Sequence, residues 1–197
     1  MTVRVIGRAA LDAWVDALIA KQRVYGVQAK EERFAFGPLE NATDLRLDYD
    51  VTILPPKKYF LPQREVLNTF NRYDMKFDSV TDAEPFVLFG VHPYDMEAIR
   101  QLDKIFERSN PDVHYLTRRE AATVVAMDAE KASEHVFAGS MGTAVGEDVE
   151  GHDVLVTKIG DDAWTVDAQT EKGEALLAAI ADAAAATDDA LAAREGV

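Results

Sequence analysis

Hydrophobic and polar positions follow two different periods along this chain, which predicts a mixture of helices and strands. Residues 3–6 predict a short alternating or buried strand that ends at Gly7. Apolar residues then recur every three or four positions, which predicts an amphipathic helix. This apolar series is Leu11, Trp14, Val15, Leu18 and Ile19, and Gly26 ends the region.

The next part of the chain predicts two strands, then a basic segment, a helix and a third strand. Residues 32–37 alternate, as do Leu45, Leu47 and Tyr49. The Pro55-Pro56 pair predicts that the two lysines after it lie on an extended segment. Pro62 suits the first turn of a helix that would end near residue 71, and residues 75–80 predict a strand.

Phe86 to Val91 is apolar throughout, which is typical of a central strand covered on both faces. A helix should follow, with Asp95 as its cap, and Asn110-Pro111 should break it. The buried stripe of this helix is predicted to be Met96, Ile99, Leu102, Ile105 and Phe106.

The last third of the chain predicts a strand at 123–127, a long loop over 128–151 and a hairpin formed by 154–159 and 163–166. One final helix should carry an apolar side and continue into an alanine-rich tail. Its apolar side is Leu176, Leu177, Ile180, Ala184 and Leu191.

These elements predict the mixed α/β (α+β) class, as one compact domain with a mixed sheet flanked by helices and an alanine-rich helix at the end. Residues 1–181 are assigned to the domain. Residues 182–197 are assigned to the exposed end of that helix, or to a linker leading to a further module.

Composition narrows the function classes. The net charge of −14 argues against nucleic acid and against anionic membrane surfaces as partners. An acidic surface serves solubility, or it steers a basic partner. No apolar run approaches the length needed to cross a bilayer, and no signal peptide is seen, so a cytoplasmic location is expected.

The chain contains no cysteine, which excludes disulfides, thiolate catalysis and iron–sulfur clusters held by its own thiolates. The four histidines do not share an element at the spacing of metal ligands, so no metal site is predicted. They are His92, His114, His135 and His152.

One candidate ligand loop lies at the end of the central strand, where His92 and Asp95 follow Val91. An imidazole and a carboxyl group there could polarise a substrate, or His92 could simply bond to backbone, since no nucleophile stands beside it. Backbone amides around Ser140, Gly142 and Thr143 could bind an anion, or that stretch could be a plain turn-rich loop.

A basic, aromatic cluster is the candidate docking surface, because aromatic residues and arginine are enriched in interface cores. The alternative is a local patch of ion pairs with nearby carboxylates. The cluster consists of Lys57, Lys58, Tyr59, Phe60 and Arg64.

Two stretches carry a resemblance to a known family: residues 55–67 (PPKKYFLPQREVL), and 90–106, which open GVHPYD and close LDKIF. Together they resemble the amino-terminal region of the dicluster [4Fe–4S] electron-transfer subunits, which include the beta subunit of soluble nickel–iron hydrogenases and sulfhydrogenases and the A subunit of anaerobic sulfite reductase. Residues 119–122, 137–143 and 153–173 resemble that region in order and spacing.

The resemblance implies that the clusters of the family belong to a ferredoxin-like module carrying two cysteine runs, none of which is present here. Members of the family also commonly carry cysteines at positions that read Tyr94, Ala129, Val136 and Ala138 in this chain. The chain is then either the amino-terminal domain of a longer subunit or a stand-alone relative without redox centres.

Two hypotheses follow. The first is a cluster-free docking domain that packs an electron-transfer subunit against redox partners of the hydrogenase, reductase or ferredoxin type, with any [4Fe–4S] clusters in an absent module or in partner subunits. The second is a small enzyme, or an anion- or nucleotide-binding domain, that uses the loop at His92 and Asp95.

Overall fold

The computed structural model describes residues 3–81, 83–131, 134, 136–180 and 184–194. An eight-stranded mixed sheet runs through the molecule in the order β10-β1-β9-β8-β7-β6-β2-β3. Its strands are β1 (Arg4–Gly7), β2 (Arg23–Lys30), β3 (Arg33–Pro38), β6 (Phe86–Val91), β7 (Ala122–Met127), β8 (Val154–Gly160), β9 (Ala163–Ala168) and β10 (Ala184–Ala185). The neighbours β2, β6, β7 and β8 are parallel, and the pairs toward both edges are antiparallel.

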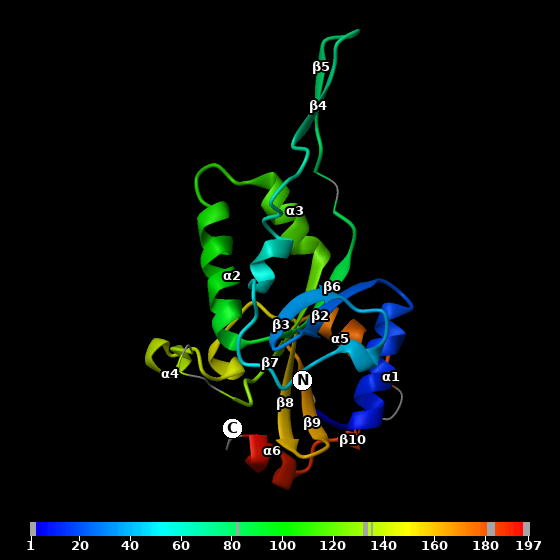
Figure 1. Ribbon diagram of the computed structural model, residues 1–197, viewed down its shortest axis with the longest axis vertical. Helices are drawn as coiled ribbons and strands as arrows, with labels where there is room; N and C mark the ends of the chain where they lie inside the picture. Colours follow the sequence, from blue (N-terminus) through cyan, green and yellow to red (C-terminus); the bar gives the residue numbers. More distant parts are fainter. Residues whose placement is uncertain (1–2, 82, 132–133, 135, 181–183, 195–197) are drawn as a thin grey trace.

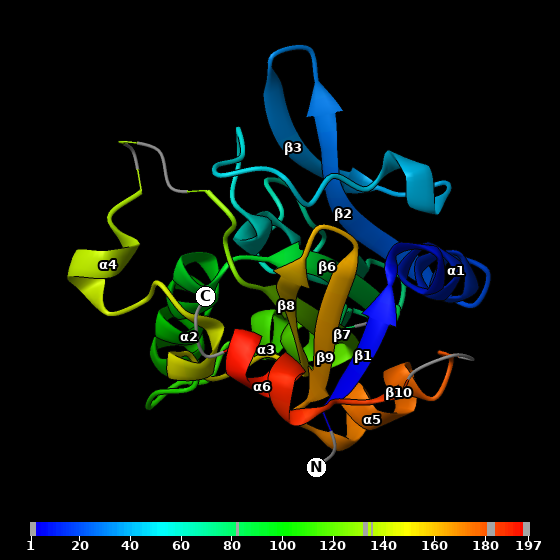
Figure 2. The same ribbon diagram turned by 90° about the horizontal axis from the view of Figure 1, so that it is seen from below.

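Helices cover both faces of the sheet (Figure 2). The described helices are α1 (Arg8–Ile19), α2 (Pro93–Phe106), α3 (Val113–Ala121), α4 (Ala138–Met141), α5 (Glu171–Leu177) and α6 (Asp188–Arg194). Three short 3-10 turns are η1 (Ala42–Asp44), η2 (Pro56–Tyr59) and η3 (Gly146–Asp148). The predicted fold class is confirmed.

Alternate residues of the central strand serve two separate cores. Val87 and Phe89 pack with α1 and α5 on one face, where the rings of Trp14 and Phe89 meet edge-on at 5.2 Å between centroids. Leu88 and Val91 pack with α2 and α3 on the other. All six residues of β6 are buried, as its uninterrupted apolar sequence predicts.

Four local predictions before the central strand are wrong. β2 runs straight through Gly26, where a Cβ would lie 2.8 Å from methyl carbons of Leu39 and Leu45, so the glycine makes room for packing over the strand. Residues 45–49 bury their apolar side chains without joining the sheet as a strand. The two lysines after Pro55-Pro56 lie in η2, because Pro56 fits its first turn.

The fourth error is the helix expected from Pro62. Residues 62–67 are not helical, and a separate two-stranded hairpin follows, made of β4 (Asn68–Asn71) and β5 (Lys76–Ser79). The apolar residues here do not face the core, so they provide no packing that would stabilise a helix.

The region around α2 and α3 also differs from prediction. Helix α2 begins at Pro93 with His92 as its N-cap, so Asp95 lies inside the first turn and makes no capping bond. Ile105 is 60% exposed and does not belong to the buried stripe. Helix α2 ends at Phe106, ahead of the break expected at Asn110-Pro111, and Asp112 then caps a further helix, α3, which the pattern did not predict.

The chain end is not one helix. Helix α5 ends at Leu177, β10 pairs with β1, and α6 is separate, so the alanine-rich stretch has neither a continuous apolar side nor a face to bury. The described residues of the predicted loop over 128–151 include α4 and η3, and the other described residues there belong to no helix or strand. His135 and the assigned boundary at residue 181 lie outside the described residues, so the two-part division of the chain stays a prediction.

Candidate docking arm and ligand loop

The β4–β5 hairpin projects away from the body of the protein as a narrow ribbon (Figure 1), and we call residues 66–80 the arm. Every residue of both strands is exposed. Phe70 and Phe77 face each other across the ribbon with ring centroids 4.7 Å apart, yet Phe77 is 73% exposed. The other exposed apolar side chains of the arm are Val66, Leu67, Tyr73 and Met75. A solvated ribbon of two strands is only marginally stable by itself.

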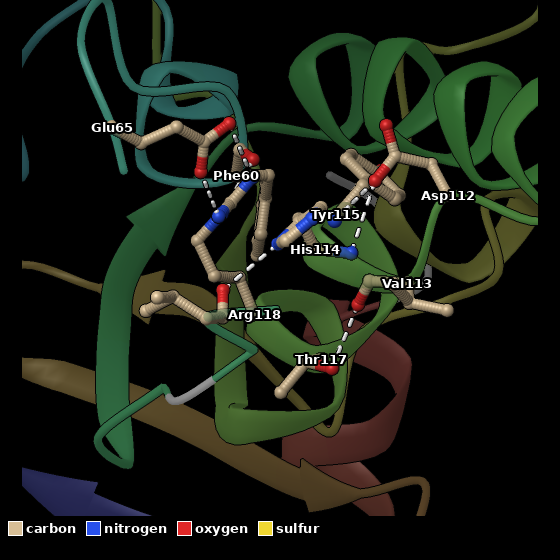
Figure 3. Close-up of polar contacts among 9 residues, drawn as sticks. Phe60, Glu65, Asp112, Val113, His114, Tyr115, Thr117 and Arg118 are labelled. Carbon is tan, nitrogen blue, oxygen red and sulfur yellow. Dashed lines mark hydrogen bonds and ion pairs between the residues drawn. The ribbon is translucent and has the colours of Figure 1, made fainter. Parts of the chain in front are cut away.

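Helix α3 holds both ends of the arm. On the entering side, the Arg118 Nε donates to the Phe60 carbonyl at 2.9 Å, and its guanidinium forms an ion pair with Glu65 (Figure 3). On the leaving side, His114 Nδ1 lies 2.9 Å from the Val80 carbonyl, so this nitrogen carries the proton and donates. Arg118 and His114 are four residues apart and therefore lie on one face of α3.

The N-terminus of α3 is fixed locally. The Asp112 carboxylate accepts hydrogen bonds from the backbone amides of His114 and Tyr115, both at 3.0 Å, and Thr117 Oγ1 donates to the Val113 carbonyl (Figure 3). This cap stabilises the first turn of α3, the helix whose side chains bind both ends of the arm.

The five residues predicted as a docking cluster separate into two groups. Phe60 is fully buried, and its ring packs against Phe86 and Tyr115, so it belongs to the core beneath the segment. Tyr59 is half-buried against Tyr25, at 4.2 Å between ring centroids.

The charged members of the cluster differ as well. Lys58 donates to the Phe36 carbonyl at 2.7 Å, and burial lowers the pKa of its ammonium group. Lys57 and Arg64 are exposed. A docking role for these residues stays a prediction.

The sequence pattern did not reveal the apolar residues of the arm as a surface. Val66 and Phe70 stand four positions apart, which suits a helix as well as an arm. A hairpin could have been predicted from Phe70 and Phe77, because these two aromatic residues flank a turn and pair across the two strands.

The ligand loop lies at the carboxyl end of β6. His92 is fully buried and its imidazole stacks on the ring of Tyr49, with centroids 4.0 Å apart and planes at 4°. Its Nδ1 is hydrogen-bonded to the Tyr94 hydroxyl, which donates to the Asp50 carbonyl. Burial lowers the pKa of His92 to about 4, so the imidazole is neutral near pH 7.

The side chain of Asp95 is not hydrogen-bonded to His92, with which it was predicted to act. Its carboxyl group is partly buried in the first turn of α2, and that burial raises its pKa to about 6, with Lys57 acting in the opposite direction. No hydrogen bond joins the side chains of the two residues, both of which are described. The phenol of Tyr94, not the carboxyl group of Asp95, is the partner of the imidazole.

Ser140, Gly142 and Thr143 were the predicted anion-binding residues. Of these, Thr143 lines a cavity of about 350 Å³ that is also lined by Tyr94 of the ligand loop. Gly142 ends α4 in the left-handed region, at φ 66°. The Ser140 hydroxyl donates to the Phe137 carbonyl, a local bond of a turn. The rest of the cavity wall is largely apolar and includes Val51, Val136, Phe137, Ala138 and Met141.

Three of the positions at which the resembled family carries cysteine face this same cavity, namely Tyr94, Val136 and Ala138. Here the side chains are a phenol, an isopropyl and a methyl group. Among the described residues, no group of three or more His, Cys, Asp and Glu side chains is arranged to hold a metal ion.

Comparison with known proteins gives one informative match. Over 154 residues the chain is 34% identical to the protein named sulfhydrogenase 2 subunit beta of Pyrococcus furiosus, a stretch that covers 77% of this chain and 43% of that protein. The chain thus spans less than half the length of this curated relative. No helix within the described residues is long and apolar enough to cross a membrane.

No protein-family profile matches the chain. No solved structure matches it either. The identity to the beta subunit extends over most of this chain, and it supports a relation between the chain and the family of that sulfhydrogenase subunit.

Proposed function

We propose that this chain is a docking domain of an electron-transfer subunit in an oxidoreductase complex of the hydrogenase or sulfite-reductase type, and that it holds no iron–sulfur cluster through its own residues. The observation that carries the proposal is its similarity to a sulfhydrogenase beta subunit over 154 residues, combined with a sequence that lacks cysteine. Without thiolates, the contribution of the domain lies in shape and surface.

The arm is the surface best suited to docking. It concentrates aromatic and aliphatic side chains on a ribbon that has no core of its own, and exposed apolar clusters of this kind mark interaction sites. Between residues 54 and 80 basic residues outnumber acidic ones, whereas the chain as a whole carries −14. An apolar groove with an acidic rim on a redox partner would complement both properties.

A pull-down from extract of the source organism tests the proposal. The wild-type chain should recover redox subunits that contain iron, and the double variant Phe70→Ser, Phe77→Ser should lose them. The matched control is Ile105→Ser, which removes an equally exposed apolar side chain from α2 outside the arm. Recovery of no redox subunit by the wild type, or equal recovery by all three proteins, would contradict the proposal.

The basic segment should contribute through charge. Lys57→Glu should weaken the same complex more at low than at high salt, because exposed charges attract over a Debye length that salt shortens. Lys57 is preferred over Lys58 for this test, since Lys58 also bonds to the Phe36 carbonyl. A loss that is independent of salt would argue for a packing effect instead.

Iron and acid-labile sulfide should be absent from the purified chain. Stoichiometric amounts of both would contradict the cluster-free role directly.

A second candidate function is a ligand-binding domain or small enzyme at the loop of His92. The cavity lined by Tyr94 and Thr143 favours this function. Its wall is largely apolar, and the hydrogen-bonded side chains of Tyr94 and His92 lie beside it, a combination that suits a small organic ligand. Thermal-shift measurements against nucleotides, flavins and acyl-CoA esters separate the two functions. Saturable stabilisation that His92→Ala abolishes would support this candidate, and no stabilisation across the panel would favour docking.

A further inference from the structure

A further cavity lies near the amino-terminal ends of β7 and β8, at the end of the parallel strands opposite the ligand loop. Its volume is about 780 Å³, within the range of small-molecule sites. The wall is formed by the start of β7, the residues directly before β8 and the end of β9, together with residues from α3, η3, α5 and α6.

Buried polar atoms that lack a partner gather in this cavity. Six such side-chain atoms occur among the described residues, and four of them belong to three residues of its wall: both ring nitrogens of His152, Oδ1 of Asp167 and Nε of Arg194. Each unpaired buried group destabilises the folded protein. Such a concentration in one place indicates a site prepared for a partner molecule.

His152 is 6% exposed and lies directly before β8. Its burial lowers the pKa of the imidazole, and the nearby carboxylates of Asp153, Asp128 and Asp167 and the Val149 carbonyl offset only part of this effect. A neutral imidazole offers one donor and one acceptor.

The neighbouring acids differ in how far they are satisfied. Both oxygens of Asp153 are used, by the Val124 amide at 2.8 Å and the Thr170 hydroxyl at 2.6 Å. Oδ2 of Asp167 accepts from Gln169 and Arg194, which leaves its Oδ1 as an acceptor.

The cations of the wall are already engaged, so an anion gains little here. Arg119 pairs with Asp103 and bonds to the Gly151 carbonyl. Lys172 donates to the Glu120 carbonyl, and Arg194 pairs with Glu147 and Asp167. Carboxylates also outnumber cations around the cavity. These residues do not form a group suited to a metal ion either.

The unpaired atoms define the ligand by complementarity. Asp167 Oδ1 requires a donor and Arg194 Nε requires an acceptor. One ring nitrogen of His152 is directed at the Val149 carbonyl, so the other nitrogen of the neutral ring is an acceptor that requires a donor. A hydroxyl group is both donor and acceptor, whereas an ammonium group would place a second cation beside Arg194. We propose that this cavity binds a small neutral molecule rich in hydroxyl groups, a sugar or polyol, through His152, Asp167 and Arg194.

Access to the four atoms requires a local movement. They are shielded from solvent here, and Arg194 extends over them from α6, a seven-residue helix without a buried residue. Movement of the Arg194 side chain away from Asp167 exposes both partners, and the ion pairs that it breaks with Glu147 and Asp167 must be offset by hydrogen bonds to the bound molecule.

Titration of the ¹⁵N-labelled full chain with D-glucose, D-ribose and myo-inositol, each to 50 mM, tests the proposal. At least one probe should cause saturable shifts of the amide resonances of residues 151–153 and 167–170. Inorganic phosphate, titrated in parallel, should cause none. Absence of saturable shifts with all three hydroxyl compounds, or saturation by phosphate instead, would overturn the proposal and leave water as the partner of these groups.

Three variants locate the binding. Asp167→Asn and His152→Phe should each weaken binding of the responsive probe at least fivefold, and Arg194→Lys, which keeps the charge but removes Nε, should do the same without altering the sheet. Asp162→Asn, in the exposed β8–β9 turn, is the matched control and should leave the affinity unchanged. If Asp167→Asn or His152→Phe fails to fold, Arg194→Lys decides, and unchanged affinity in that variant overturns the proposal.

Discussion

His114 and Arg118 stand one helical turn apart on α3 and hold the two ends of the arm, His114 through the Val80 carbonyl and Arg118 through Glu65 and the Phe60 carbonyl. The two carbonyl acceptors, those of Phe60 and Val80, are 20 residues apart in the sequence, and the arm lies between them. One short helix thereby fixes the direction of a ribbon whose two strands are fully exposed.

Loss of the Arg118 anchor should loosen the arm without unfolding the body. In Arg118→Met, trypsin should cleave after Arg72 or Lys76 about fivefold faster, the factor that about 1 kcal/mol of lost anchoring represents. Gel electrophoresis of timed digests measures this rate. Arg100→Met is the control, because its ion pair with Glu97 lies on α2 and does not touch the arm. Equal digestion of both variants would show that Arg118 does not anchor the arm.

Truncation of Phe60 should destabilise the protein strongly, whereas truncation of Phe77 in the arm should have little effect. Phe60→Ala should lower the free energy of unfolding by about 3–5 kcal/mol, since the ring is fully buried. Phe77→Ala should change it by less than about 0.5 kcal/mol, because that side chain is 73% exposed. Urea unfolding followed by circular dichroism measures both, and a large loss in Phe77→Ala would mean that the arm packs on the body.

The elements that the sequence predicted correctly are those whose apolar residues face a core. Helix α1 and the central strand β6 show a clear period or an uninterrupted apolar run, and both are buried as expected. The helix predicted in the region of the arm was wrong, because Val66 and Phe70 have helical spacing but do not face a core. Helix α3 was missed because only Tyr115 among its residues is buried.

The sites were less predictable than the fold. The position of His92 at a strand end was readable from the sequence, but its stacking on Tyr49 and its bond to Tyr94 depend on the folded chain. The polar cavity joins His152 to Arg194, 42 positions later, and no spacing rule connects them. Contacts of this kind come from topology, which places the end of β9 and α6 beside the start of β8.

Gly173 in α5 tests the packing beside that cavity, and Gly139 in α4, away from it, is the matched control. A Cβ at Gly173 in α5 would lie 2.0 Å from the Asp153 carbonyl oxygen, so Gly173→Ala should cost at least about 2 kcal/mol of unfolding free energy. A Cβ at Gly139 in α4 meets nothing within 4 Å, so Gly139→Ala should be neutral or stabilising by up to about 1 kcal/mol. Thermal unfolding compares the two, and equal midpoints would contradict the close approach of α5 to Asp153.

His92 should make the stability of the protein depend on pH. Its pKa in the fold is lowered to about 4, against an ordinary value of 6.5, so between these values the unfolded chain binds a proton that the folded chain does not. The stabilising contribution of the neutral imidazole is therefore complete above pH 6.5 and is lost as the pH falls toward 4, by up to about 3 kcal/mol. Asp95, whose pKa is raised to about 6, changes stability in the opposite sense over the same range.

Because the two groups oppose each other, the effect of His92 is measured as a difference between proteins. Urea unfolding of wild type and His92→Gln at pH 7.5 and pH 4.5 should show that the wild type loses more stability on acidification than the variant does. The imidazole resonance of His92 should stay at its neutral position down to about pH 5. A midpoint near 6.5 for that resonance would mean that the ring is solvated and does not stack inside the loop against Tyr49.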